Sequence, residues 1–235
     1  MKKLLCAALL LWGIGNLHAQ KKTVEKTLPV PASQKVQLNL KFADSIRVTA
    51  WDKKEAYVKV TYEINGGKLN EALVLTFTPS QDQLQVLADL DKELVKQGKP
   101  EDCPDQSSKS FGHYINGKPT QLTCTNINYE IFLPRTVDLA LETINGDIEL
   151  RGFTGPIKAK SISGFVDMDW SSQKGASVAL KTITGEVYSD LDITFNDKRE
   201  KAPMVGYTLK GQIQEGGPII QLETISSNVY FRRKK

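Results

Sequence analysis

The sequence predicts a single elongated all-β domain built from stacked short strands. Three observations lead to this prediction. Apolar and polar residues alternate with a period of two along most of the chain, a short phrase returns until it has appeared four times, and glycine recurs at a nearly constant spacing within it.

The repeated phrase consists of a strand, a four-residue corner and a second strand. It reads LETINGDIEL from Leu141, KSISGFVDM from Lys160, KTITGEVYS from Lys181 and ETISSNVYF from Glu223. Alternation on both sides of each corner is typical of half-buried strands. The corners end in Gly146, Gly164, Gly185 and Ser227. We expect the glycines to supply a backbone geometry that a Cβ would obstruct, and Ser227 to mark a terminal repeat whose geometry can relax.

The spacing of the corners favours a stack over a series of hairpins. The glycines lie 18 and 21 residues apart, and Ser227 follows 42 residues later, which is two steps of 21. A period near twenty residues is typical of a solenoid, in which each unit buries its apolar face only against its neighbours. The longer gap is expected to hold an excursion at 192–217 with a polar loop at 196–201.

The N-terminal half alternates in the same way but without a repeat. Strands are expected at 36–42, 46–48, 56–62, 73–77, 84–88 and 127–133, with weak helical character at 89–98 and a polar loop at 103–118. No compositional linker divides residues 20–235, so we expect them to form one domain.

Residues 1–19 are expected to be a signal peptide that is cleaved before Gln20. Two lysines precede an apolar run at 4–12, and the small residue Ala19 precedes the cut. That run is too short to span a bilayer and no later run is longer, so no transmembrane span is expected. Without residues 1–19 the chain keeps 29 of its 31 basic residues against 27 acidic ones, a net charge of +2 that gives no support for nucleic-acid binding. The expected location is the periplasm, the cell surface or the medium.

Two cysteines remain in the exported chain, Cys103 and Cys124. A pair of cysteines in an oxidising compartment predicts a disulfide. Free thiols, or a metal site formed with His113, Asp102 or Asp105, are the alternatives, although the cysteines lack the paired spacing of a zinc site. We expect no cofactor.

Polar residues gather at the corners. The acids there are Asp147, Glu149, Asp167, Asp169, Glu186, Asp190 and Asp192. Their alternation with apolar residues predicts a solvated outer face, with ion binding or glycoside hydrolysis as alternatives. Thr143, Ser161, Thr182 and Thr224 form a hydroxyl column that is expected to satisfy backbone groups, because His113 alone cannot complete a catalytic triad. Ile144, Ile162, Ile183 and Ile225 are expected to pack unit on unit.

Two tyrosines offer the best candidate binding face. Tyr188 and Tyr230 occupy equivalent repeat positions, with the opposite parity to the core valines beside them. They are therefore expected on the outer face, where aromatic rings can stack on a sugar or a peptide, although ordinary packing between units explains them as well. Trp51 and Tyr207 are further aromatic candidates, whereas Trp170 has the parity of the core.

The sequence also resembles a known family. TNINYEIFLP (125–134), LETINGDIEL, KTITGEVYSDL and the closing GGPIIQLETISSNVYFRRKK together resemble the exported bacterial putative-adhesin family, domains of unknown function built from β-strand repeats. FADSIRVTAWDKKEAYVKV (42–60) fits the family's opening strands, so the resemblance covers most of the exported chain. It implies a right-handed β-helix or β-roll-like solenoid, with a less regular N-terminal portion in this chain, and it supplies no catalytic residues. Ser227 departs from the glycine of the corner.

These observations favour an exported, non-enzymatic binding module for a surface glycan or an envelope protein. One alternative is a structural envelope component that assembles end to end through uncapped repeats. Another is a polysaccharide-active enzyme, which would need converging acids in a groove.

Overall fold

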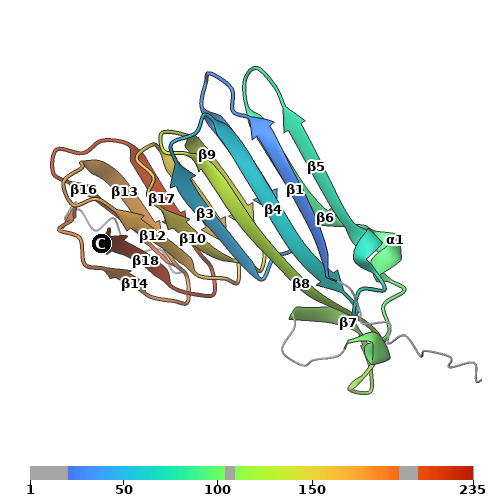
Figure 1. Ribbon diagram of the computed structural model, residues 1–235. Helices are drawn as coiled ribbons and strands as arrows, with labels where there is room; N and C mark the ends of the chain where they lie inside the picture. Colours follow the sequence, from blue (N-terminus) through green and yellow to red (C-terminus); the bar gives the residue numbers. More distant parts are fainter. Residues whose placement is uncertain (1–20, 104–108, 196–205, 235) are drawn as a thin grey trace, which may run out of the picture.

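The chain forms two large β-sheets (Figure 1). The computed structural model describes residues 21–103, 109–195 and 206–234, and within these ranges each sheet has nine strands. Sheet A runs in the order β1 (Lys22–Pro29), β4 (Glu55–Ile64), β8 (Lys118–Pro134), β3 (Ser45–Trp51), β10 (Asp147–Arg151), β12 (Val166–Trp170), β18 (Val229–Arg233) and β14 (Val187–Ser189), with β7 (Lys109–Ile115) paired to β8. Sheet B runs in the order β15 (Thr194–Phe195), β16 (Thr208–Ile213), β13 (Ala176–Lys181), β17 (Ile219–Glu223), β11 (Ile157–Ser161), β9 (Asp138–Thr143), β2 (Lys35–Leu40), β6 (Leu84–Leu90) and β5 (Leu73–Pro79).

Helical structure is confined to three single turns in the described part of the chain. They are α1 (Lys92–Val95) and two 3-10 turns, η1 (Asn70–Ala72) and η2 (Pro100–Asp102). Asp91 caps α1, because its Oδ1 accepts the N–H groups of Glu93 and Leu94 at 2.8 and 2.9 Å. None of these helices is long and apolar enough to cross a membrane. The all-β prediction is confirmed, and the predicted signal peptide lies outside the described residues.

Five pairs of consecutive strands cross from sheet B to sheet A, and we call each pair a repeat unit. The units are β2–β3, β9–β10, β11–β12, β13–β14 and β17–β18. Neighbouring units pair in parallel in both sheets, so that Leu141 lies beside Ala159 in sheet B and Ile148 beside Val166 in sheet A. The four copies seen in the sequence are the last four units. The first was missed because its corner, around Phe42, lacks the Thr-Ile-x-Gly phrase.

The spatial order of the units differs from their order in the chain. β18 lies between β12 and β14, and β17 lies between β11 and β13. The C-terminal unit is therefore inserted between the second and third copies of the phrase. The expectation that Ser227 marks a terminal repeat is wrong, because its corner lies between those of Gly164 and Gly185.

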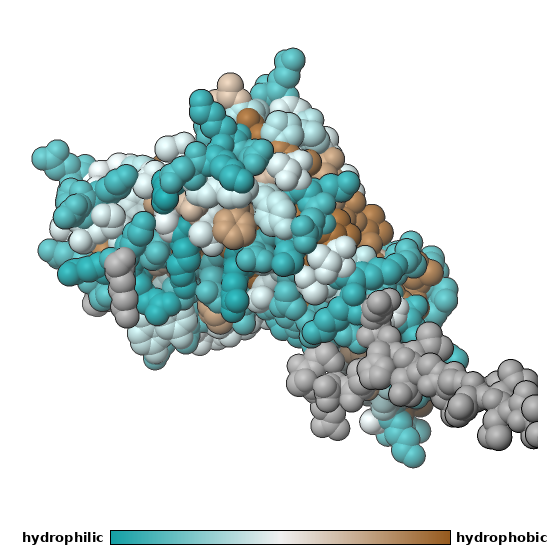
Figure 2. Space-filling view, viewed as in Figure 1, coloured by the Kyte–Doolittle hydropathy of each residue, from teal (hydrophilic) through white to brown (hydrophobic). Residues whose placement is uncertain are grey.

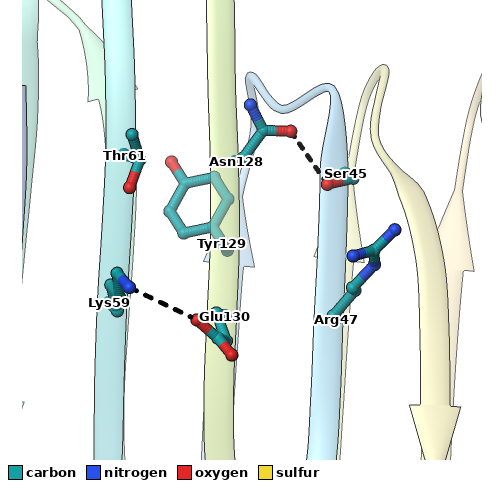
Figure 3. Close-up of a pocket in the computed structure, with 7 residues that line it drawn as sticks. All are labelled: Ser45, Arg47, Lys59, Thr61, Asn128, Tyr129 and Glu130. Atoms are coloured by element: carbon teal, nitrogen blue, oxygen red, sulfur yellow. Dashed lines mark hydrogen bonds and ion pairs between the residues drawn. The ribbon is translucent and has the colours of Figure 1, made fainter. Parts of the chain in front are cut away.

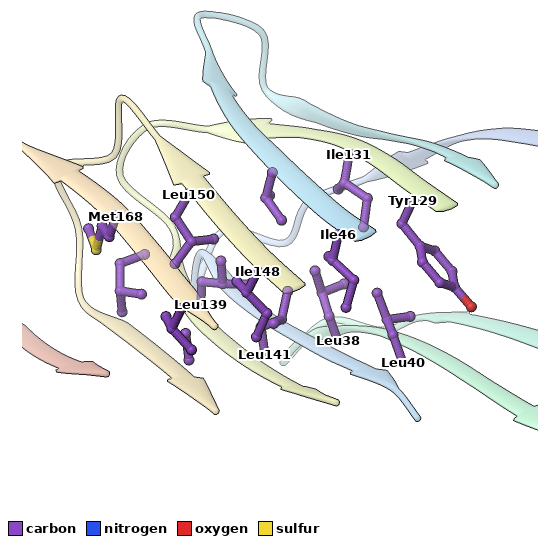
Figure 4. Packing of buried hydrophobic residues seen from close by; sticks show 14 of the residues in the cluster. Leu38, Leu40, Ile46, Tyr129, Ile131, Leu139, Leu141, Ile148, Leu150 and Met168 are labelled. Carbon is purple, nitrogen blue, oxygen red and sulfur yellow. The ribbon is translucent and has the colours of Figure 1, made fainter. Parts of the chain in front are cut away.

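The core lies between the two sheets and is continuous through both halves of the chain (Figure 4). It is built from the apolar positions of the alternating strands, such as Leu38, Leu141, Ile148 and Met168, each at most 1% exposed. Burying a side chain of this size contributes about 2 kcal/mol. Trp170 is also in the core, as its parity predicted, and its indole N–H donates to the Lys174 carbonyl at 2.9 Å.

The N-terminal half departs from the prediction in two places. The segment at 103–118 is not only a loop, because β7 forms an antiparallel hairpin with β8 whose register shifts between His113 and Tyr114. β1 was not predicted at all, since it is polar and lies at the edge of sheet A. The excursion at 192–217 contains β16, which pairs antiparallel with β13, while its polar loop lies outside the described residues.

Candidate functional site

The hydroxyls at the corners link each repeat unit to the next. Thr143, Ser161 and Thr224 are buried and Thr182 is half-buried. Ser161 donates to the Gly146 carbonyl at 2.9 Å, Thr224 donates to that of Gly164 at 2.8 Å, and Thr182 donates to that of Ser227 at 2.7 Å. These bonds follow the spatial order of the units. The column therefore satisfies backbone groups, as expected.

The corner glycines are required by close approach between units. A Cβ on Gly164 would lie 2.0 Å from the Gly146 carbonyl oxygen, and one on Gly185 would lie 1.9 Å from the Ser227 carbonyl oxygen. The corner glycines also take part in hydrogen bonding, since Gly164 donates its N–H to the Ser161 hydroxyl at 2.9 Å. Obstruction by a Cβ was predicted correctly, and its cause is the neighbouring corner.

The corner isoleucines lie at the surface and outside the main core. Ile162 is 38% exposed, and Ile144, Ile183 and Ile225 are half-buried. Their backbones are what join the corners, because Ser226 donates its N–H to the Ile162 carbonyl at 3.0 Å. Neighbouring corners are thus joined by hydrogen bonds of their backbone and hydroxyl groups.

Three aromatic rings form a column on the outer face of sheet A. The Tyr188 and Tyr230 rings stack with their centroids 5.2 Å apart and their planes 10° apart, and Phe165 meets Tyr230 edge-on at 6.1 Å. The parity prediction for both tyrosines agrees with this position. Tyr188 is 45% exposed and belongs to β14, whose other edge pairs with no strand in the described ranges. One face of its ring therefore ends the column.

Polar groups hold the tyrosine rings in place. The Asn228 side chain accepts the Glu186 N–H at 2.9 Å and donates to the Tyr230 hydroxyl at 3.0 Å. The Tyr188 hydroxyl donates to the Glu186 carboxylate, and this hydrogen bond raises the pKa of the Tyr188 phenol. The Arg232 guanidinium lies 5.8 Å from the Tyr230 ring centroid. The result is an ordered aromatic surface with a carboxylate and a cation beside it.

The acids near the corners are divided between solvent and ion pairs. Asp167 is buried on the outer side of sheet A, against the expectation of a solvated position, because Arg151 and Arg232 cover it. The Arg151 Nη2 lies 2.7 Å from Asp167 and 3.4 Å from Glu149. Glu186, like Asp190 and Asp192, is exposed. Glu149 of β10 and Asp167 of β12 therefore neutralise arginines of their own and neighbouring strands, whereas Asp147 and Asp169 accept backbone N–H groups.

A shallow depression of about 240 Å³ lies further along the same face, over β4, β8 and β3 (Figure 3). It is lined by Ser45, Arg47, Lys59, Thr61, Asn128, Tyr129 and Glu130. Its polar groups bond to one another: Lys59 lies 3.6 Å from Glu130, and Ser45 donates to Asn128 at 2.8 Å. The depression is thus a weaker candidate site than the tyrosine column.

Cys103 and Cys124 form a disulfide with their Cα atoms 5.8 Å apart, as the sequence predicted. It ties η2 to β8. Among the described residues, no group of three or more His, Cys, Asp or Glu side chains is placed to hold a metal ion. His113 lies exposed on β7, and Asp105 lies outside the described residues.

Comparison with known proteins supports the fold. The chain is similar to the crystal structure of a putative cell adhesion protein from Clostridium sporogenes, with a TM-score of 0.54 and 13% identity over 92% of this chain and 100% of that one. Two further crystal structures are more distant. A putative adhesin from Bacteroides fragilis has a TM-score of 0.26 and 10% identity over 92% of this chain and 99% of that one. A putative lipid binding protein from Parabacteroides distasonis has a TM-score of 0.25 and 10% identity over 91% of this chain and 97% of that one. No family model and no curated protein matches the sequence. At these identities the first similarity shows the fold alone.

Sequence analysis missed two residues of the aromatic site, Phe165 and Asn228. A signal was present, because both directly follow a corner, at the position that Asp147 and Glu186 occupy in other copies. The insertion of the last unit hid it, since Phe165 and Tyr230 become neighbours only when β18 lies beside β12.

Proposed function

We propose that this chain is an exported, non-enzymatic binding module of the adhesin type, and that its tyrosine column recognises a surface glycan. The observation that carries the proposal is the exposed ring face of Tyr188 at the free edge of sheet A. A sugar ring that stacks on this face continues the column formed by Tyr188, Tyr230 and Phe165. We also propose that the parallel repeat units form a short right-handed β-solenoid, which positions the rings in one line.

The groups beside Tyr188 suit the hydroxyl-rich edge of a sugar. The Glu186 carboxylate accepts hydrogen bonds, and the exposed residues Arg232 and Arg233 lie on β18, the strand next to β14. Asn228 fixes the Tyr230 ring before any ligand arrives, which reduces the entropy lost on binding. An envelope protein as ligand is the alternative, and it is an outcome of the experiment below.

Two features favour this proposal over the other hypotheses. The acids nearest the centre of sheet A, Glu149 and Asp167, are in ion pairs with Arg151, whereas hydrolysis needs a free acid and base. End-to-end assembly is opposed at the edge of sheet A, where β1 places Lys22 and Lys26 on its core-facing side, because inward-facing lysines disfavour pairing with another edge strand.

The experiment is binding of residues 20–235 to arrayed glycans and envelope proteins. We expect Tyr188→Ala to lose glycan binding, and Tyr207→Ala, which removes a 63% exposed tyrosine outside the column, to retain it. Tyr188→Phe keeps the ring but not the hydroxyl, and is expected to bind. Binding that survives Tyr188→Ala places the site elsewhere, capture of proteins alone identifies the other ligand class, and no binding at all contradicts the proposed function.

A further inference from the structure

The two sheets end in unlike edge strands at the N-terminal end of the molecule. β1 is the edge of sheet A and β5 the edge of sheet B. β1 carries lysines at 22 and 26 on its core-facing side, since these residues pair with Tyr62 and Val58, which point into the core. β5 reads LVLTFTP and contains no charged residue over its seven positions. An inward-facing lysine protects an edge against an incoming strand, and β5 has no such protection.

Apolar side chains remain partly uncovered along β5. Leu73, Leu75 and Phe77 face the core but are only half-buried, and Val74 on the other face is 47% exposed. Figure 2 shows hydrophobic surface in this part of the molecule. Strands further inside sheet B are fully covered, as Leu84 and Val86 of the neighbouring β6 show. Among the described residues, β5 therefore has no outer neighbour to complete the burial of its side chains.

The two sheets also differ in width at this end. Beyond the first repeat unit, sheet A continues with three strands, β8, β4 and β1, and sheet B continues with two, β6 and β5. The core-facing residues Val24 and Leu28 of β1 are only half-buried. One further strand beside β5 would make the sheets equal and supply apolar contacts to β5.

We propose that the free edge of β5 accepts one extended strand from a protein partner. The outer backbone groups of β5, which pair with no other strand in the described part of the chain, supply main-chain hydrogen bonds, and the alternate residues of the incoming strand face the core beside Leu75 and Phe77. The core-side residues of that strand are apolar and include an acid. The acid is expected to pair with Lys26, because this lysine faces inward on β1 and joins none of the ion pairs among the described residues. Lys22, in contrast, is paired with Glu71.

A second copy of the chain fits this edge less well than a foreign strand. Pairing β5 with β5 of another molecule would bring both β1 strands to one place, where Lys26 of each copy adds like charge. At this end sheet B is one strand narrower than sheet A, so the space beside β5 fits one strand. Pairing with a second copy would instead join a whole further sheet to β5.

The test uses the labelled peptide Thr-Val-Thr-Glu-Thr-Val-Thr, whose side-chain pattern reads the same in both directions and places the glutamate at the centre. We expect saturable binding in fluorescence polarisation and slower hydrogen exchange of the β5 amides. A control peptide methylated at alternate backbone nitrogens cannot pair with an edge and is expected not to bind. Replacing the central glutamate by lysine is expected to weaken binding about tenfold at low salt, through repulsion from Lys26.

Two variants locate the binding edge. Leu75→Lys copies the protection that β1 carries and is expected to abolish binding, whereas Thr194→Lys, on the edge strand β15 at the opposite end of sheet B, is expected to retain it. The methylated peptide keeps the test valid if Leu75→Lys fails to fold, since it needs only the native protein. Equal binding of the unmethylated and methylated peptides, or no binding of the unmethylated peptide at millimolar concentration, overturns the proposal. A dimer of the native chain that Leu75→Lys dissociates also overturns it and assigns the edge to a second copy.

Discussion

The repeat units and the N-terminal strands share one core but are joined by different contacts. In the repeat units, equivalent residues form the same bond again and again, as Ser161 and Thr224 do with the glycine carbonyls of neighbouring corners. In the N-terminal half, single contacts join segments far apart in the chain, such as the Asn65 side-chain oxygen that accepts the Cys124 N–H at 3.1 Å. Strands with the same alternation of buried and outward residues are therefore connected by repeated hydrogen bonds in the repeat units and by individual contacts in the N-terminal half.

The two halves are therefore expected to differ in how strongly a substitution at a turn destabilises the fold. The three inner corners each lie between two others, in close contact with them, so a change in one is transmitted to its neighbours. The N-terminal half has open turns, as at the β7–β8 hairpin, where nothing lies within 4 Å of a Cβ built on Gly117.

The largest expected effect is that of Gly164→Ala. Its Cβ would meet the Gly146 carbonyl oxygen at 2.0 Å, and since that atom belongs to the backbone, the corners must separate. We expect the free energy of unfolding in urea to fall by about 3 kcal/mol. Gly117→Ala is the matched control, and its positive φ of 75° is expected to cost about 1 kcal/mol. Equal losses would contradict the comparison.

The disulfide gives the next largest effect, in the N-terminal half. Cys103 and Cys124 are separated by 21 residues, and closing such a loop stabilises a protein by about 3 kcal/mol in the chain-entropy model, with smaller values common. We expect the double variant Cys103→Ser/Cys124→Ser to lose up to this amount in urea unfolding. Reduction of the native protein by dithiothreitol should produce the same loss. If it leaves the unfolding curve unchanged, the hairpin is held by β7–β8 pairing alone.

The comparison also explains which features the sequence could predict. Repeated contacts appear in the sequence as repeated letters, so the strands, the corners, the hydroxyl bonds and the outer position of Tyr188 were all visible. The insertion of β17–β18 was not visible, because Ser227 and its neighbours look like a fourth copy in any order of stacking. β1 was missed since an edge strand with inward lysines has no apolar alternation to detect. The narrower width of sheet B could not be predicted either, because it depends on strand pairing between distant segments.

The smallest effect compares one tyrosine from each half. The pKa of Tyr188 is raised mainly by its hydrogen bond to Glu186, and that of Tyr57 mainly by its hydrogen bond to Glu25. Each bond needs the neutral phenol, so its stabilising effect is complete below the unfolded pKa of about 10 and is lost as the pH rises through the higher folded pKa. We expect Glu186→Gln and Glu25→Gln each to move one phenol to lower pH in an ultraviolet titration. Tyr129, whose pKa is raised by burial, should contribute no transition in either variant. A shift of both phenols in either variant would mean that the two halves are coupled electrostatically along sheet A, and would contradict the prediction that each carboxylate acts on its own tyrosine alone.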